Sequence, residues 1–166
     1  MTSQPYLNLV RFKQWADDGL YDVVGRSFDQ LGLEDSTILR RILDHILVVD
    51  LIFRNRLRGQ RSDFAAPRSD ELPDLRRLTE LTKEVDQWYV EHVGRLSDEE
   101  FNRELAFSFT SGKSARMTVG EIIEHVSLHG TYHRGMAGVI LQKFGIDPND
   151  DRLSDFLEAA CTRAPR

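Results

Sequence analysis

The sequence predicts an all-α protein, an up-down four-helix bundle in which residues 1–166 form a single domain. Apolar residues recur at intervals of three and four in four long segments, which is the period of a helix with one buried face. The chain of 166 residues is 40% hydrophobic and 30% charged, which suffices for one core of ordinary composition. The expected helices cover residues 6–31, 37–58, 74–96, 118–144 and a short terminal stretch, 153–160.

The first two helices are defined by their apolar stripes and by the residues between them. The first stripe consists of Leu9, Phe12, Trp15, Ala16, Leu20, Val23, Val24 and Phe28. Gly32 ends that helix, and Asp35 or Ser36 can cap the next one. The second stripe has steps of four and three, the spacing of an inward-facing bundle seam, and consists of Ile38, Ile42, His45, Val49 and Ile52. His45 is therefore expected at a core position.

The connection between the third and fourth helices differs from the rest of the chain. Phe101, Leu105, Phe107 and Phe109 alternate with polar residues, and Ser111-Gly112-Lys113 follows as a turn. This pattern predicts a short, irregular hairpin or extended crossover between the two helices. Thr118 and Glu121 have the spacing of a capping box, which predicts the start of the fourth helix.

The composition excludes several classes of protein. A net charge of −5 and a pI near 5.5 argue against a nucleic-acid partner, because contact with phosphates needs a basic surface. The single cysteine, Cys161, excludes an internal disulfide framework and a multi-thiolate zinc site. No apolar run is long enough for a membrane helix, and no secretory signal is visible. We therefore expect a cytoplasmic protein without a membrane partner.

Three of the five histidines, His125, His129 and His133, recur at four-residue spacing. Helical residues four apart share a face, so two of them can hold one metal ion. Spacing alone does not choose the pair, but His125 and His133 diverge by about 80° and cannot both reach one ion. His133 lies among apolar residues in mid-helix, whereas His125 is near the capped end beside Glu124. We therefore prefer His129 and His133 as ligands, completed by His45, with His125 beside the site.

Three imidazoles buried together need partners, since an unpaired buried polar group costs about 1–3 kcal/mol. One divalent ion would satisfy all three and keep an open coordination position for water. A di-iron carboxylate bundle is excluded, because it requires two E-x-x-H motifs and this chain contains none.

Four segments carry a resemblance to a known family over nearly the whole chain: FKQWADDGL, LDHILVVDLIFRNRL, EHVSLHGTYHRGMAGVILQKFG and IDPNDDRLSDFL. With them the chain resembles the DinB/YfiT-like family of bacterial metal-binding four-helix bundles. The resemblance implies that His45, His129 and His133 bind a divalent cation, nickel, zinc or a similar ion. It also implies a homodimer formed through the bundle helices.

The chain departs from the family pattern at two positions. Asp17 stands where the family usually has asparagine, and Met136 stands where glutamine usually follows H-R-G. An aspartate that faced the ion could act as a ligand or a base, so Asp17 is a catalytic candidate together with Tyr132. Trp15 and Arg134 are expected, like His125, to lie around the ligands. Asp44 and Asp50 are expected on a solvated helix face.

Two functions follow from the resemblance. The first is a metal-dependent enzyme, either a hydrolase or a transferase that acts with a low-molecular-weight thiol on a small-molecule substrate. The alternative is a non-catalytic, stress-associated interaction module in which the metal is structural.

Overall fold

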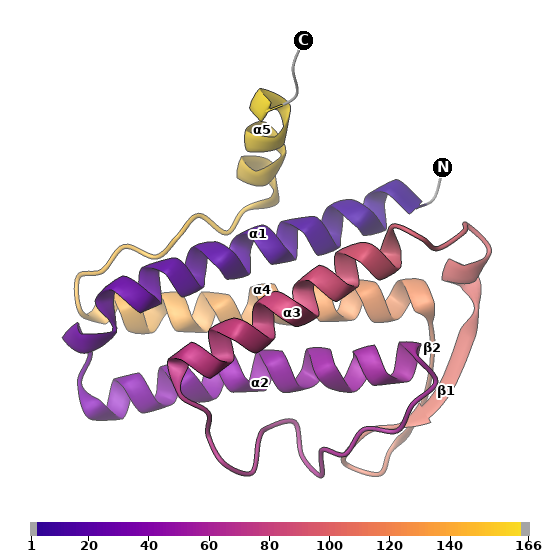
Figure 1. The fold of residues 1–166 in the computed structure, drawn as a ribbon, viewed down its shortest axis with the longest axis horizontal. Coiled ribbons are helices and arrows are strands. Elements are labelled where there is room, and N and C mark those ends of the chain that lie inside the picture. Colours follow the sequence, from indigo (N-terminus) through magenta and orange to yellow (C-terminus); the bar gives the residue numbers. More distant parts are fainter. Residues whose placement is uncertain (1–2, 164–166) are drawn as a thin grey trace.

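The computed structural model describes residues 3–163 and is mostly helical, with one small antiparallel sheet (Figure 1). The elements in chain order are α1 (Ser3–Ser27), a 3-10 turn (Phe28–Gln30), α2 (Leu33–Leu57), α3 (Leu75–Val93), a second 3-10 turn (Glu100–Asn102), β1 (Glu104–Ser108), β2 (Ser114–Thr118), α4 (Val119–Lys143) and α5 (Leu153–Arg163).

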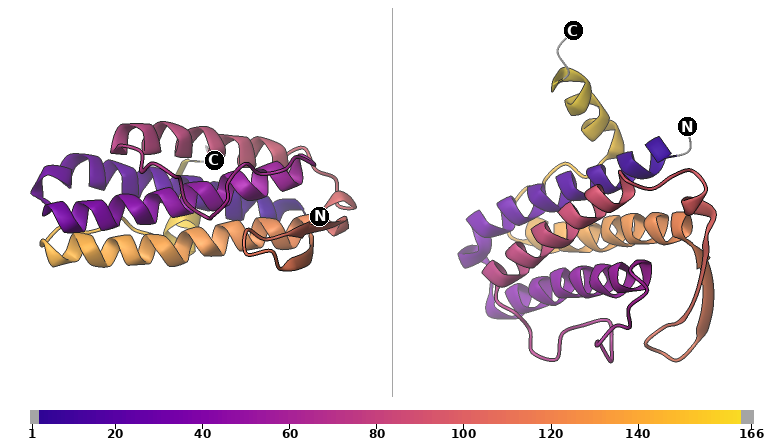
Figure 2. Two further views of the ribbon diagram at one scale, coloured as in Figure 1. Left: turned by 90° about the horizontal axis from the view of Figure 1, so that it is seen from below. Right: turned by 45° about the vertical axis from the view of Figure 1, so that its right-hand side comes forward.

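The four long helices pack so that α1 and α2 each contact both α3 and α4. Lys13 meets Asp86 and Tyr21 meets Thr82, so α1 and α3 are antiparallel. Figure 1 shows α1 and α4 running in one direction and α2 and α3 in the other. The strict up-down alternation predicted from the sequence is therefore wrong for one connection. Residues 58–74 return along the outside of the bundle, so α3 starts at the same end as α2 (Figure 1, Figure 2).

Helix α2 begins earlier than predicted, at Leu33, with Gly32 as its N-cap residue in extended conformation. The hydroxyls of Ser36 and Thr37 donate to the carbonyl oxygen of Leu33 and therefore do not cap the helix. The start of α4 is as predicted. Thr118 accepts from the Glu121 backbone N–H, and the Glu121 carboxylate accepts from the Thr118 N–H.

The segment predicted as a short, irregular hairpin or an extended crossover forms a regular hairpin. Strands β1 and β2 are antiparallel, in a register that runs from Glu104 opposite Thr118 to Ser108 opposite Ser114. Gly112 at the turn has φ +83°, a conformation that favours glycine. Strand β1 contacts α2 and β2 contacts α4, so the hairpin lies where α2 ends and α4 begins (Figure 1).

The core fills the space between the four long helices. Its largest fully buried apolar side chains include Leu20, Leu39, Leu43, Leu47, Leu78, Tyr89, Ile122, Ile123 and Leu141. Within residues 3–163, no helix combines the length and the apolar character that crossing a bilayer would require.

Candidate metal centre

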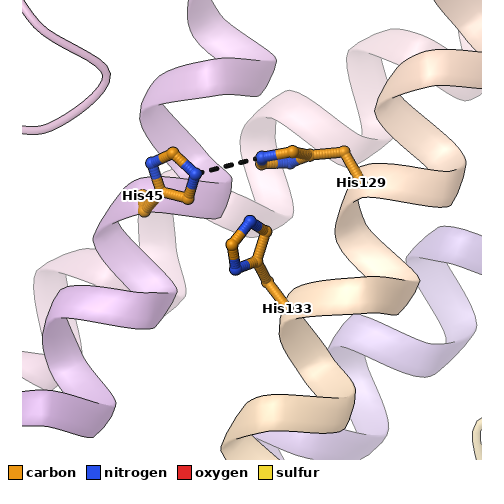
Figure 3. A group of neighbouring side chains, drawn as sticks. All are labelled: His45, His129 and His133. Atoms are coloured by element: carbon orange, nitrogen blue, oxygen red, sulfur yellow. Dashed lines mark hydrogen bonds between the residues drawn. The ribbon is translucent and has the colours of Figure 1, made fainter.

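Three histidines from two helices meet between α2 and α4 (Figure 3). His45 comes from α2, and His129 and His133 lie one turn apart on α4. The ring centroid of His45 lies 4.9 Å from that of His129 and 4.5 Å from that of His133, and the two α4 rings are 4.4 Å apart. One nitrogen from each ring lies within 4.8 Å of the other two. The structure thus brings together the three residues selected as ligands.

The orientation of His45 is fixed by the loop between α2 and α3. Its Nδ1 lies 2.7 Å from the Pro67 carbonyl oxygen, which can only accept, so Nδ1 carries the proton. Nε2 of His45 therefore carries the lone pair, the form in which an imidazole binds a metal, and it accepts a hydrogen bond from Nε2 of His129 (Figure 3). The loop is held in turn by Asp44, whose carboxylate accepts from the Ser69 N–H at 2.9 Å and from its hydroxyl at 2.6 Å. Asp44 is buried, which corrects the expectation of a solvated face.

The distance between the first two nitrogens suits one small ion. Nε2 of His45 and Nε2 of His129 are 3.1 Å apart. Two nitrogens bound to one tetrahedral ion at about 2.0–2.1 Å lie about 3.3 Å from each other. A donor set of imidazoles alone is compatible with zinc, nickel, copper or iron and disfavours calcium and magnesium. The residues present therefore fit a divalent transition metal.

The environment of the site favours the neutral form of the two α4 imidazoles, His129 and His133. Burial, followed by the neighbouring His133 and His45, lowers the pKa of His129 to about 3. Burial and His45 also lower the pKa of His133. Neutral histidine is the form that coordinates metals, so the site favours an ion over protons at neutral pH. Nδ1 of His129 is buried without a hydrogen-bond partner among the described residues.

His125 lies beside the three histidines without joining them. Its ring centroid is 5.7 Å from that of His129 and 4.9 Å from that of Phe53. Both His125 and His129 line a cavity of about 260 Å³ between α2, the hairpin and α4. Its other lining residues are Val49, Ile52, Phe53, Pro67, Phe107, Ser108, Phe109, Thr110 and Ser111. The structure therefore places a pocket directly against one of the candidate ligands.

Asp17 does not contact the histidines. One of its oxygens lies 2.7 Å from Lys13 Nζ and the other accepts from Arg134 at 3.1 Å. Burial alone would raise the pKa of Asp17, but Lys13 and Arg134 hold it below its usual value. Arg134 also binds Asp151 through two hydrogen bonds, at 2.7 and 3.0 Å. Both residues are thus committed to a buried ion-pair network, and neither is available as a base or as an anchor at the histidines.

Trp15 lies away from the three histidines, whereas Tyr132 contacts one of them. Trp15 packs against Phe12 and against Phe156 of α5, and among the described residues it makes no contact with the three histidines. The Tyr132 ring meets that of His133 edge-on at 5.0 Å, but its side chain is 69% exposed. Tyr132 is not among the residues that line the cavity.

Lys13, at the centre of the ion-pair network, was not predicted from the sequence. Its ammonium lies 2.7 Å from Asp17, 2.7 Å from Asp50 and 2.6 Å from Asp86, and all four side chains are buried. Asp50 is therefore not on a solvated face as expected. Lys13 lies four residues after Leu9, on the apolar stripe of α1. A lysine at such a position indicates a buried ammonium, and this signal was present in the sequence.

The fold and the site define a helical-bundle protein with a histidine site able to hold a divalent metal. The family model of the DinB family matches residues 1–165, and the chain belongs to that family. Comparisons with curated proteins and with solved structures found no match.

Proposed function

We propose that this protein binds a divalent cation, nickel, zinc or a similar ion, through His45, His129 and His133, and that it is a metal-dependent enzyme. The observation that carries the proposal is the convergence of three imidazoles, two with lowered pKa values, beside a cavity that His129 helps to line. When bound, the ion would lower the pKa of water or of a thiol and so favour the nucleophilic form.

The residues around the cavity favour a thiol over water as the nucleophile. Within the described part of the chain, no carboxylate lines the cavity, and His125 is the one titratable group there besides His129. A thiol, with a pKa near 8.5, needs much less help to lose its proton than water at 15.7. Transfer involving a low-molecular-weight thiol is therefore our first choice of reaction, and hydrolysis is the second.

The metal assignment is tested by the metal content of purified protein loaded separately with zinc and with nickel. We expect one ion per chain in the wild type and a loss of at least tenfold in affinity in His45→Ala and His133→Ala. His92→Ala is the matched control, because His92 is half-buried and stacks on Trp88 away from the site. If both ligand variants retain one metal ion per chain, the assignment of the metal ligands is wrong.

The reaction is tested by assays of the loaded protein with bacillithiol, mycothiol and glutathione against electrophilic acceptors, and with activated esters. Turnover that disappears in His133→Ala and survives in His92→Ala supports an enzyme. Turnover of esters without a thiol would favour the hydrolase.

The alternative is a non-catalytic, stress-associated module with a structural metal. Its support is the position of the histidines, which would let one ion join α2 to α4. A large fall in melting temperature on chelation, together with an ion that exchanges no ligand with added thiol, would favour this role.

We also propose a homodimer that works in the cytoplasm, where small thiols stay reduced. Helix α4 supports the dimer, because Leu128, Tyr132, Met136 and Val139 form an exposed apolar stripe along it. The net charge of −5 offers no basis for a nucleic-acid partner.

A further inference from the structure

We infer that the cavity beside the histidines binds the uncharged, apolar part of the substrate, a single ring or a short branched chain, and that His125 contacts the substrate and not the ion. This inference rests on the proposed function, because it names the substrate class of the same site.

The cavity lies directly against the candidate metal site. His129 belongs to the candidate metal site and also lines the cavity, so a ligand held there has one end next to the ion. Helix α2 supplies one wall, with Phe53, and the hairpin supplies the facing wall, with Phe107 and Phe109. The Phe107 ring contacts both other phenylalanines, at 5.8 and 5.4 Å between centroids. The walls therefore form a continuous aromatic surface.

Among the described residues, no carboxylate, ammonium or guanidinium group lines the cavity. The polar side chains there, besides the histidines, are the hydroxyls of Ser108, Thr110 and Ser111. The guanidinium of Arg56 is near but does not line the cavity. Its Nη2 donates to the Ser108 carbonyl oxygen at 3.0 Å, its Nε is buried without a hydrogen-bond partner among the described residues, and its Cζ lies 5.7 Å from the centroid of Phe107. A carboxylate or phosphate in the cavity would lose its hydration without gaining a counter-ion, which is costly. An uncharged group carries no such penalty.

The volume of the cavity limits the size of the group that it can hold. At about 260 Å³, the cavity is smaller than the range of about 300–1,000 Å³ typical of sites for drug-sized ligands. A single ring fits this space, whereas a nucleotide or a tripeptide thiol does not. In a thiol transfer, the apolar acceptor would therefore occupy the cavity, and the larger, charged part of the thiol would stay outside it.

The ring of His125 is available to a ligand in the cavity. It lies on the cavity wall between Phe53 and His129, and within the described residues neither of its ring nitrogens has a hydrogen-bond partner. The same ring is outside the group of three nitrogens able to share an ion. A half-buried imidazole with free nitrogens is suited to hydrogen-bond a polar substituent of the bound ligand.

The cavity is tested without any metal, by fluorine NMR titration of 4-fluorobenzyl alcohol into chelator-treated protein. We expect saturable binding in the wild type, at least tenfold weaker binding in Thr110→Trp, which fills the cavity, and unchanged binding in Lys113→Trp. Lys113 is the matched control because it belongs to the same exposed turn and does not line the cavity. The anion 4-fluorobenzoate should bind at least tenfold more weakly than the alcohol. Equal binding by the two tryptophan variants, or by the alcohol and the anion, overturns the inference.

The role of His125 is tested with 4-fluorotoluene, which lacks the hydroxyl. The wild type should prefer the alcohol to the toluene by about fivefold, consistent with one net hydrogen bond of about 1 kcal/mol. His125→Phe should lose that preference while keeping its zinc. An unchanged preference, or a loss of zinc, would overturn the assignment of His125.

A third measurement separates this inference from the proposed function. In zinc-loaded protein, 4-fluorobenzyl mercaptan should bind at least tenfold more tightly than the alcohol, and His133→Ala should abolish that gain. If the protein binds no metal, the proposed function fails. The titration of 4-fluorobenzyl alcohol into chelator-treated protein still tests whether the cavity binds an apolar group. If zinc binds but 2-mercaptoethanol matches the aromatic thiol, the metal function survives and the apolar cavity is rejected.

Discussion

At the residue scale, the candidate ligands were predictable and their orientation was not. His129 and His133 follow from helical spacing, and His45 follows from its place in the apolar seam of its helix. The proton position on His45 depends on the carbonyl of Pro67, which is 22 residues away in a loop without a periodic pattern. A sequence pattern identifies residues that share a helix face, but it does not predict which loop atom will meet them.

The lowered pKa of His129 makes the stability of the metal-free protein depend on pH. Its pKa is about 3 in the folded state, against an ordinary value of 6.5 that holds for the unfolded chain. The unfolded state therefore binds more protons below pH 6.5, so the free energy of unfolding falls as the pH drops from about 6.5 toward 3. Urea unfolding of chelator-treated protein over this range should show a shallower fall in His129→Phe. Identical pH profiles would refute the prediction.

Asp17 pairs with two buried cations, Lys13 and Arg134, so removing its charge should lower the free energy of unfolding. Asp17→Asn leaves Arg134 with a single carboxylate partner, Asp151, and weakens the pairing of Lys13. Breaking a buried ion pair from one side typically costs about 3–5 kcal/mol, and we expect a loss of that order in the free energy of unfolding. Asp18→Asn is the control, because Asp18 is exposed on the same turn and should change stability by less than about 0.5 kcal/mol. A loss below about 1 kcal/mol for Asp17→Asn would contradict this account.

At the element scale, local signals were reliable and helix directions were not. The alternation of Leu105 and Phe107 predicted extended chain, and Thr118 with Glu121 predicted the start of α4, since each signal acts over a few residues. The direction of α3 depends on where residues 58–74 lead the chain. That segment is polar and aperiodic, so the sequence contains no signal that distinguishes a turn back from a return along the bundle.

The close contact between α1 and α4 leaves no room for a side chain at Gly120. A Cβ at Gly120 would lie 2.5 Å from the Tyr6 hydroxyl oxygen and 2.8 Å from its Cζ, and the Tyr6 ring is held by stacking on Phe101 at 4.6 Å. Gly120→Ala should therefore reduce the free energy of unfolding by about 1–3 kcal/mol, the usual cost of overpacking. A Cβ at Gly25, which is exposed on α1, would meet nothing within 4 Å. Gly25→Ala should therefore leave the free energy of unfolding unchanged or raise it by up to about 1 kcal/mol. Denaturant midpoints that move in the same direction for both variants would exclude this packing argument.

At the scale of the whole molecule, α4 presents three chemically different faces. One face carries His129 and His133 toward α2, and another carries Arg134 into the ion-pair network with α1. Gly130 lies between these two faces of α4, and a Cβ at this position would lie 2.9 Å from Nη1 of Arg134. The third face points outward and carries the apolar stripe. The position of α4 is thus fixed on two sides by polar contacts, which leaves its outer face free to bind a partner.

The proposed homodimer follows from that outer face. Leu128 and Val139 are 66% and 67% exposed, and no charged residue lies on the exposed side of α4 between Glu124 and Lys143. Two copies of such a stripe can pair about a twofold axis without opposing like charges, since the same surface meets itself. Light scattering after size exclusion should give a dimer for the wild type and a monomer for Leu128→Glu/Val139→Glu, because two buried, unpaired carboxylates in each copy would oppose association. Gln87→Glu is the control, because Gln87 is exposed on α3 and not on α4, and this variant should stay dimeric. A monomeric wild type, or a double variant that remains dimeric, would rule out α4 as the interface.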